Sequence, residues 1–223
     1  MPVTDAYTDA ATYRGRLGKN DAGQDTAILV DLTAVSRFID RKCHRFFIQD
    51  GSAVARLFYP QGYYRGDPEA ENPWRYVQGA RTLWVDDIAT SAGLQIVVDD
   101  GRDGSFSGDT AWASTDYQLL PLNADKGPEP KPFTSIFVPT WSSKSGFNPG
   151  SLIQVTAVWG WPSIPKAIVA ATIQLTGILR LDSPRATERI PEAMDAAFDE
   201  SPTAQKLIAE LMTVYMRHDL VIA

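Results

Sequence analysis

The sequence has very few of the side chains that most often carry catalysis or bind metals. It contains a single cysteine, Cys43, and two histidines among 223 residues. One cysteine cannot form a disulfide within the chain, and it excludes a cysteine-rich metal site. The motifs G-x-G-x-x-G, G-x-x-x-x-G-K-[ST] and H-E-x-x-H are all absent. We therefore predict that the protein is not an enzyme and has no catalytic residues, cofactor or metal.

The chain also lacks an excess of basic residues. It carries 21 Lys and Arg against 27 Asp and Glu, which gives a formal net charge of −6. Residues 1–45, 46–164 and 165–223 contribute about +1, −5 and −2, so no segment is a basic platform. Lys and Arg side chains that neutralise phosphates provide most of the affinity of nucleic-acid binding. We therefore do not expect the protein to bind DNA tightly. It could still surround DNA without binding it.

Long apolar runs are missing as well. No stretch of roughly 18 apolar residues occurs, so no transmembrane helix is predicted. The first residues, MPVTDAYTDA, have neither a basic stretch nor an apolar core, so we expect no secretory signal. With 44% hydrophobic and 22% charged residues, the composition is that of a globular protein with a sizeable core. These features predict a protein that is made and used in a reducing, aqueous compartment, or that assembles there first.

Helical patterns occupy the N-terminal part of the chain. Thr8 is suited to cap a short helix that runs to about Leu17, and Asp25 to cap a second helix that runs to about Cys43. Apolar residues of the second segment recur at the spacing of one helical face: Ile28, Leu32, Val35 and Ile39.

The C-terminal part is also helical. Pro165 suits the first turn of an apolar helix over the following 16 residues, and Ser201-Pro202 begins a last helix. Between them, residues 183–200 are expected to be loop-like or partly helical.

The middle of the chain changes to a period of two. Short runs rich in β-branched and aromatic residues alternate with Gly, Pro and Asp loops. These runs are 56–60, 81–88, 94–100, 116–122, 135–139 and 151–161. The fold class is therefore predicted to be α+β: a helical frame built from residues 1–45 and 165–223, with a β-rich insertion, a small antiparallel sheet or sandwich, at residues 46–164.

Three patterns suggest chemistry, and each has a plainer explanation. Cys43 and His44 are adjacent, but neighbours on a helix point about 100° apart, so a buried thiol at a helix end is the favoured interpretation. The segment 104–108 (GSFSG) has Phe106 where a nucleophile elbow needs serine. The acidic segment 99–104 breaks the calcium-loop pattern and is interpreted as a solvated turn.

Carboxylates leave one further enzymatic alternative. Asp86 and Asp87 follow a strand-like run and are expected to be exposed. A hydrolase with an unrecognised pair of acidic residues stays an alternative, although 27 such residues make chance proximity common.

The six tryptophans require an explanation. Trp84, Trp159 and Trp161 lie in strand-like runs, where core packing is expected for at least some of them. Trp74, Trp112 and Trp141 lie near loops or strand ends, where an exposed aromatic ring can anchor an interface. Exposed rings can also stack on sugars, so a carbohydrate-binding β-module with helical flanks is an alternative function.

Several segments, in their order along the chain, resemble a known family. They are the run Ile-Asp-x-x-Cys-x-Arg-Phe-Phe (39–47), the segment Tyr-Gln-Leu-Leu-Pro-Leu-Asn (117–123), and Val-Trp-Gly-Trp (158–161) followed by Pro165 and an apolar helix. In this order of elements the chain resembles the head-to-tail connector, or adaptor, proteins of long-tailed bacteriophages. These segments are packing landmarks and contain no catalytic signature.

The resemblance implies a structural virion protein of the neck, assembled in the host cytoplasm. Such adaptors form a homo-oligomeric ring, typically of twelve subunits, that docks under the portal protein and meets a tail-side completion protein. DNA passes through the ring without specific binding, and no membrane is involved. With the tryptophans Trp74, Trp112 and Trp141, the C-terminal residues Tyr215, Leu220, Val221 and Ile222 are the candidate interface. Packing of this apolar end on its own helical frame is the alternative.

Overall fold

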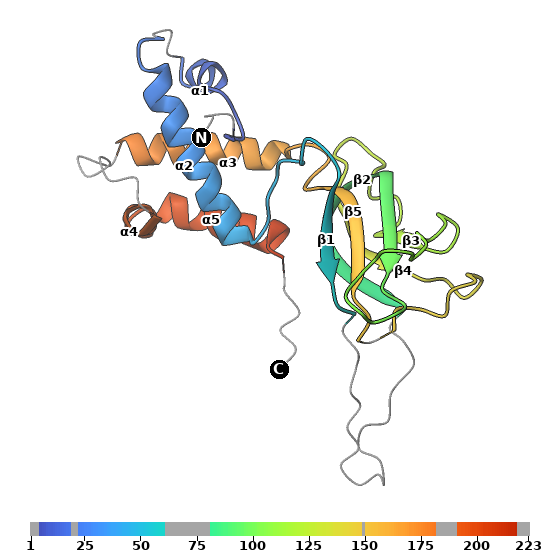
Figure 1. The fold of residues 1–223 in the computed structure, drawn as a ribbon. Helices are drawn as coiled ribbons and strands as arrows, with labels where there is room; N and C mark the ends of the chain where they lie inside the picture. Colours follow the sequence, from blue (N-terminus) through green and yellow to red (C-terminus); the bar gives the residue numbers. More distant parts are fainter. Residues whose placement is uncertain (1–4, 19–21, 61–80, 149, 182–190, 218–223) are drawn as a thin grey trace. The chain divides into compact units, whose positions relative to one another are not determined.

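The structure is a computed structural model that describes residues 5–18, 22–60, 81–148, 150–181 and 191–217 (Figure 1). The chain divides into two compact units. One unit joins the two ends of the chain, Met1–Ile48 and Ile164–Ala223, and the other is the middle, Gln49–Ser163. Helices occupy the first and a sheet occupies the second. The predicted α+β fold class is therefore confirmed.

The helical unit contains five helices among its described residues. They are α1 (Ala10–Arg16), α2 (Asp25–Cys43), α3 (Lys166–Leu181), α4 (Pro191–Asp199) and α5 (Pro202–Tyr215). The long helix α2 packs against α1, α3 and α5, while α4 packs against α3 and α5. Helices from the two ends of the sequence thus share one core. Among the described helices, none is long and apolar enough to cross a membrane.

The first two helices begin differently from the sequence-based prediction. Asp9, and not Thr8, caps α1: its carboxylate accepts a hydrogen bond from the Thr12 backbone N–H at 2.6 Å. Asp25 is the first residue of α2 and not its cap, which is Gln24 without a side-chain hydrogen bond. The Asp25 carboxylate instead pairs with Arg14 at 2.7 Å and so joins α1 to α2.

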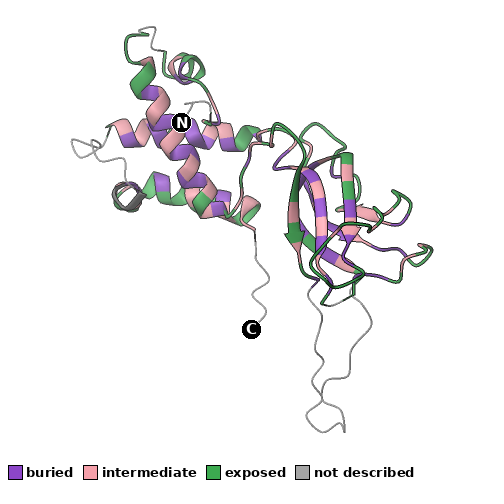
Figure 2. Ribbon diagram, viewed as in Figure 1, coloured by how far each residue is buried: buried purple, intermediate pink, exposed green. Residues whose placement is uncertain are grey.

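The apolar face predicted for α2 is buried. Ile28, Leu32, Val35 and Ile39 are at most 4% exposed, and Figure 2 shows buried residues recurring along α2 and α3. Ile28 and Leu32 form a cluster with α1 and with Ile173 of α3. One ion pair supports this packing, because Arg180 of α3 contacts the buried Asp31 of α2 at 2.5 Å.

The C-terminal helices follow the predicted order. Of the segment expected to be loop-like or partly helical, residues 191–199 form α4, and residues 182–190 lie outside the described part. Ser201 caps α5 by accepting from the Ala204 N–H at 3.4 Å, with Pro202 at the start of the helix. That predicted start is confirmed.

The described residues of the β unit form one five-stranded sheet. Its strands are β1 (Val54–Phe58), β2 (Thr82–Val98), β3 (Gln118–Leu120), β4 (Phe133–Phe137) and β5 (Ile153–Trp159). Their order in the sheet is β1-β5-β2-β4-β3, and all neighbours are antiparallel.

Strand β2 joins two runs that the sequence analysis separated. The predicted strands 81–88 and 94–100 are one strand of 17 residues. Its first part pairs with β4 and its later part with β5, and the register shifts between Thr90 and Gln95. Gly93, with a φ of +73°, lies in this shift, where a left-handed backbone favours glycine. The two predicted runs are therefore one strand with an irregular stretch between Thr90 and Gln95.

The sheet core is centred on β5. Its residues alternate strictly between buried and half-buried, and Trp159 is its largest fully buried side chain. Phe58 and the Arg56 guanidinium pack on the Trp159 ring, the latter 4.6 Å from the ring centre. Trp84 differs from its strand neighbours because it is 56% exposed.

Candidate docking sites

The buried carboxylates of the β unit stabilise turns and strands. Asp99, at the end of β2, is 2% exposed and accepts hydrogen bonds from the backbone N–H groups of Asp103 and Gly104, at 3.2 and 2.9 Å. The acidic loop therefore closes on its own backbone. Within the described residues, no group of three or more His, Cys, Asp or Glu side chains is placed to hold a metal ion.

The pair Asp86-Asp87 was expected to be exposed, and for Asp87 this is wrong. Both residues lie inside β2, where Asp87 is 6% exposed and accepts from the Trp161 indole N–H at 3.0 Å. Asp86 pairs with Arg56 at 2.8 Å. The two side chains thus fix Trp161 and Arg56, which the sequence did not indicate.

A third buried carboxylate holds the turn that carries an exposed tryptophan. Asp116, which is 9% exposed, accepts from the Ala113 N–H at 3.1 Å and from the Ser143 hydroxyl at 3.0 Å. The Ser142 hydroxyl donates to the same carboxylate at 3.4 Å. Trp141, which directly precedes Ser142, is 72% exposed. The ring is therefore presented on an ordered turn, which lowers the entropy lost when a partner binds it.

The other candidate interface residues are placed differently. Trp112 is half-buried and stacks on Phe147, with ring centres 5.0 Å apart and an interplanar angle of 16°. Tyr215 is also half-buried and meets Phe47 edge-on at 5.6 Å. Both rings pack within their own unit. Trp74, Leu220, Val221 and Ile222 lie outside the described residues.

The edge of the sheet at β1 carries further exposed apolar side chains. Val54, Leu57 and Tyr59 are 46, 56 and 66% exposed. Within the described part of the chain β1 pairs with β5 alone, so β1 is an edge strand of the sheet. An edge of this kind can accept another strand.

A buried polar cluster lies at the C-terminal end of α2. The Tyr7 hydroxyl donates to the Asp40 carboxylate and accepts from the Phe47 N–H at 3.1 Å. Arg37 lies 3.1 Å from the same carboxylate. Burial, and then the nearby charge of Asp5, raise the pKa of Asp40 to about 8. The cluster ties the N-terminal segment to the residues that follow α2.

Cys43 and His44 do not form a nucleophile and base. The Cys43 side chain is fully buried, and burial, followed by the charge of Asp40, raises the pKa of its thiol to about 11. His44 ends α2 in a left-handed conformation, with a φ of 50°. The favoured interpretation of Cys43 as a buried thiol is confirmed.

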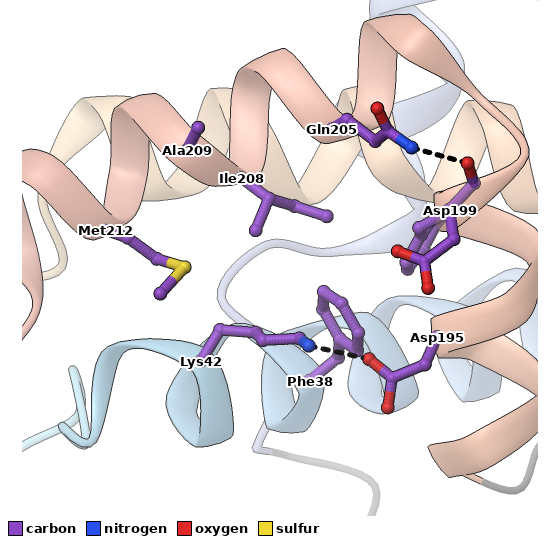
Figure 3. A pocket seen from close by; sticks show the side chains of 9 residues that line it. Phe38, Lys42, Asp195, Asp199, Gln205, Ile208, Ala209 and Met212 are labelled. Atoms are coloured by element: carbon purple, nitrogen blue, oxygen red, sulfur yellow. Dashed lines mark hydrogen bonds and ion pairs between the residues drawn. The ribbon is translucent and has the colours of Figure 1, made fainter.

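A groove lies between α2, α4 and α5 of the helical unit (Figure 3). Its volume is about 230 Å³, below the range of roughly 300–1,000 Å³ usual for small-molecule sites. Its lining includes Phe38 and Lys42 of α2, Asp195 and Phe198 of α4, and Ile208 and Met212 of α5.

Ion pairs join α2 to α4 along one wall of this groove. Lys42 and Arg41 both pair with Asp195, at 2.8 and 2.7 Å, so the basic end of α2 is bound to α4. Phe38 and Phe198 meet edge-on below them at 4.8 Å. Sequence reasoning missed the groove, because it is made by three helices whose contacts no local pattern encodes.

Comparison with known proteins reveals a similar fold. A chain from the neck of an empty gene transfer agent (GTA) particle, computed with C6 symmetry, is similar over 99% of this chain and 94% of its own, with a TM-score of 0.50 and 17% identity. A chain from the virion of a native GTA particle gives a TM-score of 0.48 and 17% identity, over 100% and 95% of the two chains. No family model matches the sequence, and no curated protein matches it. The first likeness extends over both units, so the two chains share a fold.

Proposed function

We propose that the protein is a head-to-tail connector: a structural subunit of the neck of a tailed, phage-like particle. It docks as a ring, of twelve subunits as in the family it resembles, under the portal protein. The ring extends the DNA channel and gives the tail-side completion protein a platform. The localisation proposed is the virion neck, with assembly in the host cytoplasm.

One observation carries this proposal. The likeness to a chain of the GTA neck extends over 99% of this chain and 94% of the other, so it includes both units. A similarity of only one unit would be weaker support, because a small helical bundle or a five-stranded sheet occurs in many proteins.

The chemistry of the described residues is consistent with this role. Their buried carboxylates are occupied by backbone, indole and hydroxyl donors, as for Asp99, Asp87 and Asp116. The net charge of −6 suits a channel wall along which DNA must slide, since basic contacts would retain it. A ring also requires two different patches on each subunit.

The assembly state tests the proposal. We would measure the mass by light scattering for the full chain alone and after mixing with portal rings of the same particle type. A ring-sized particle, or a chain that binds portal rings, supports the connector. A monomer that ignores the portal overturns it.

Trp141 supplies a sharper test of the docking surface. Trp141→Ala should weaken binding to the portal or to neighbouring subunits by at least about tenfold, as loss of an aromatic anchor does. The urea midpoint should not change, because the ring is 72% exposed. Trp84→Ala, which removes a 56% exposed tryptophan from the same unit, is the matched control. Equal losses in both variants would contradict a specific role for Trp141.

A carbohydrate-binding module is the second candidate function. The two exposed tryptophans of the β unit, Trp84 and Trp141, favour it because exposed indole rings stack on sugars. Binding on a glycan array that is lost in both alanine variants would support this function in place of the connector.

A further inference from the structure

The groove between α2, α4 and α5 combines an apolar lining with an acidic end. Phe38, Ile208 and Met212 supply the apolar lining. In Figure 3 the carboxylate of Asp199 lies at the end of the groove away from Met212. Asp199 is the last residue of α4, the exposed Glu200 follows it, and no basic residue lies in that last turn, although the C-terminal end of a helix favours cations. The groove therefore suits an apolar side chain that brings a positive charge with it.

The C-terminal end of α1 carries side chains of this kind. Arg16 is the last residue of α1 and Leu17 is its cap; both are exposed, Leu17 by 44%. The Leu17 backbone N–H donates to the carbonyls of Tyr13 and Arg14, at 3.3 and 3.0 Å, so the backbone that carries the leucine is ordered. An ordered apolar anchor loses little entropy on binding. In the described part of the chain, neither Arg16 nor the Asp199 carboxylate is paired with another side chain.

These two surfaces lie at opposite ends of α2 (Figure 1). The end of α1 is held at the first residue of α2 by the pair Arg14–Asp25. The groove is held at the last turn of α2 by the pair Lys42–Asp195. Asp25 and Lys42 are 17 residues apart on this helix, which is about 25 Å at 1.5 Å per residue. A subunit therefore cannot place its own Leu17 in its own groove, whereas a second copy of the chain can.

We propose that the end of α1 docks in the groove of a second copy of the chain, with Leu17 against the apolar lining and Arg16 at Asp199. The groove volume of about 230 Å³ is smaller than a usual small-molecule site, as suits one aliphatic side chain. Because each subunit carries both surfaces, the contact is head-to-tail and repeats from copy to copy. If the connector function also holds, on which this step alone rests, the repeat closes into the ring of the neck.

Charge reversal tests the contact in the full chain. In Arg16→Glu and in Asp199→Lys the two surfaces of a subunit carry charges of the same sign, which opposes the contact. In an equal mixture of the two variants, opposite charges face each other at every contact between unlike subunits. Each variant alone should therefore associate at a concentration at least about tenfold higher than the mixture, measured by sedimentation. The control mixture pairs Arg16→Glu with Glu210→Lys, an exposed position of α5 that does not line the groove, and should not associate better than Arg16→Glu alone.

Cysteine cross-linking detects the contact even where it is weak, with little background because Cys43 is the one native cysteine and is fully buried. We would mix a Leu17→Cys chain with a tagged Ala209→Cys chain, whose new thiol lines the groove. Disulfide-linked heterodimers should form at least about tenfold faster than from Leu17→Cys and Glu210→Cys, because docking raises the effective concentration at position 209. Equal rates in the two mixtures would overturn the proposal, as would equally fast linkage of Leu17→Cys chains to one another.

The remaining outcomes separate this contact from the connector function. Particles that stop at two copies would overturn the head-to-tail arrangement. If portal rings, and not the Leu17→Cys chain, protect Ala209→Cys from a thiol reagent, the groove binds the portal and the proposal fails. If the preferential cross-link forms but the chain ignores portal rings, the contact stands and the connector function fails. If the chain binds portal rings without a preferential cross-link, the reverse holds.

Discussion

The carboxylate of Asp40 should make the helical unit less stable as the pH rises. Its side chain is 15% exposed and accepts from the Tyr7 hydroxyl. Burial and the charge of Asp5 raise its pKa from 3.8 to about 8. The folded protein therefore holds a proton that the unfolded chain releases at a much lower pH.

The sign and size follow from proton linkage. The stabilisation from the bound proton is complete below the unfolded pKa of 3.8 and is lost as the pH rises to the folded value of about 8. Between these limits the free energy of unfolding falls by up to about 1.4 kcal/mol per pH unit from this group. Over the whole window the loss is at most about 5–6 kcal/mol. Arg37, 3.1 Å away, favours the charged carboxylate and lowers this sum.

Asp40→Asn removes the titration but keeps an oxygen acceptor for the Tyr7 hydroxyl. We would measure urea unfolding of both proteins from pH 5 to pH 9. The difference in unfolding free energy, variant minus wild type, should rise with pH and level off above about pH 8. The helical unit can be followed by circular dichroism at 222 nm, because the described helices all lie in it. Tryptophan fluorescence reports the other unit separately, because all six tryptophans lie within residues 49–163.

Asp9→Asn is the matched control. The backbone hydrogen bond from Thr12 lowers the pKa of Asp9 below 3.8, so this group stays charged throughout the same pH range. Its variant keeps an oxygen that can accept from the Thr12 N–H, because asparagine is also a good helix cap, and it should show a difference that does not depend on pH between 5 and 9. A flat difference for Asp40→Asn as well would refute the reasoning.

Three other predictions concern the packing of the two units. Cys43, which is fully buried with a pKa raised to about 11, should not react with a thiol reagent at pH 8 until urea unfolds the protein; rapid reaction of the native chain would contradict its burial. Trp159→Ala should destabilise the β unit by about 3–5 kcal/mol, measured as a lower urea midpoint in fluorescence, because this ring is 1% exposed. Asp31→Ala should lower the free energy of unfolding by about 3 kcal/mol, because it removes the buried ion-pair partner of Arg180. Asp195→Ala, at a partly exposed pair, should lower it by at most about 1 kcal/mol. Urea unfolding followed by circular dichroism measures both losses, and equal losses would contradict the difference in burial.

Hydrophobic periodicity correctly predicted the helix and the strand that bury one face along their whole length. The apolar stripe of α2, from Ile28 to Ile39, and the alternation in β5 are each set by burial on one side. Ser201 could be predicted as a cap because Pro202 follows it directly. At α1 the neighbours Thr8 and Asp9 are both good caps, and the carboxylate formed the hydrogen bond. Local sequence did not distinguish them.

The errors arose where tertiary contacts override a local signal. The sequence analysis ended one strand at residue 88 and began another at residue 94, but pairing with β5 continues beyond Gly93, so both runs belong to β2. Asp87 looked exposed because carboxylates usually are, yet the indole N–H of Trp161, 74 residues away, satisfies it. The groove between α2, α4 and α5 depends on Asp195, which is 153 residues from Lys42. No periodicity within one segment reports such pairs.

The same contacts explain why this sequence has no chemical signature. Burying a carboxylate is costly unless donors satisfy it, and in this protein the donors are structural: the N–H groups of Asp103 and Gly104 for Asp99, and two serine hydroxyls for Asp116. A carboxylate occupied in this way is held in a turn and is not directed into a cleft. Asp116 holds Ser142 and Ser143, and the neighbouring Trp141 stays exposed to solvent. The buried carboxylates therefore fix the turns that present exposed side chains, and those exposed side chains are the candidates for binding a partner. Trp141 is the first of them to substitute.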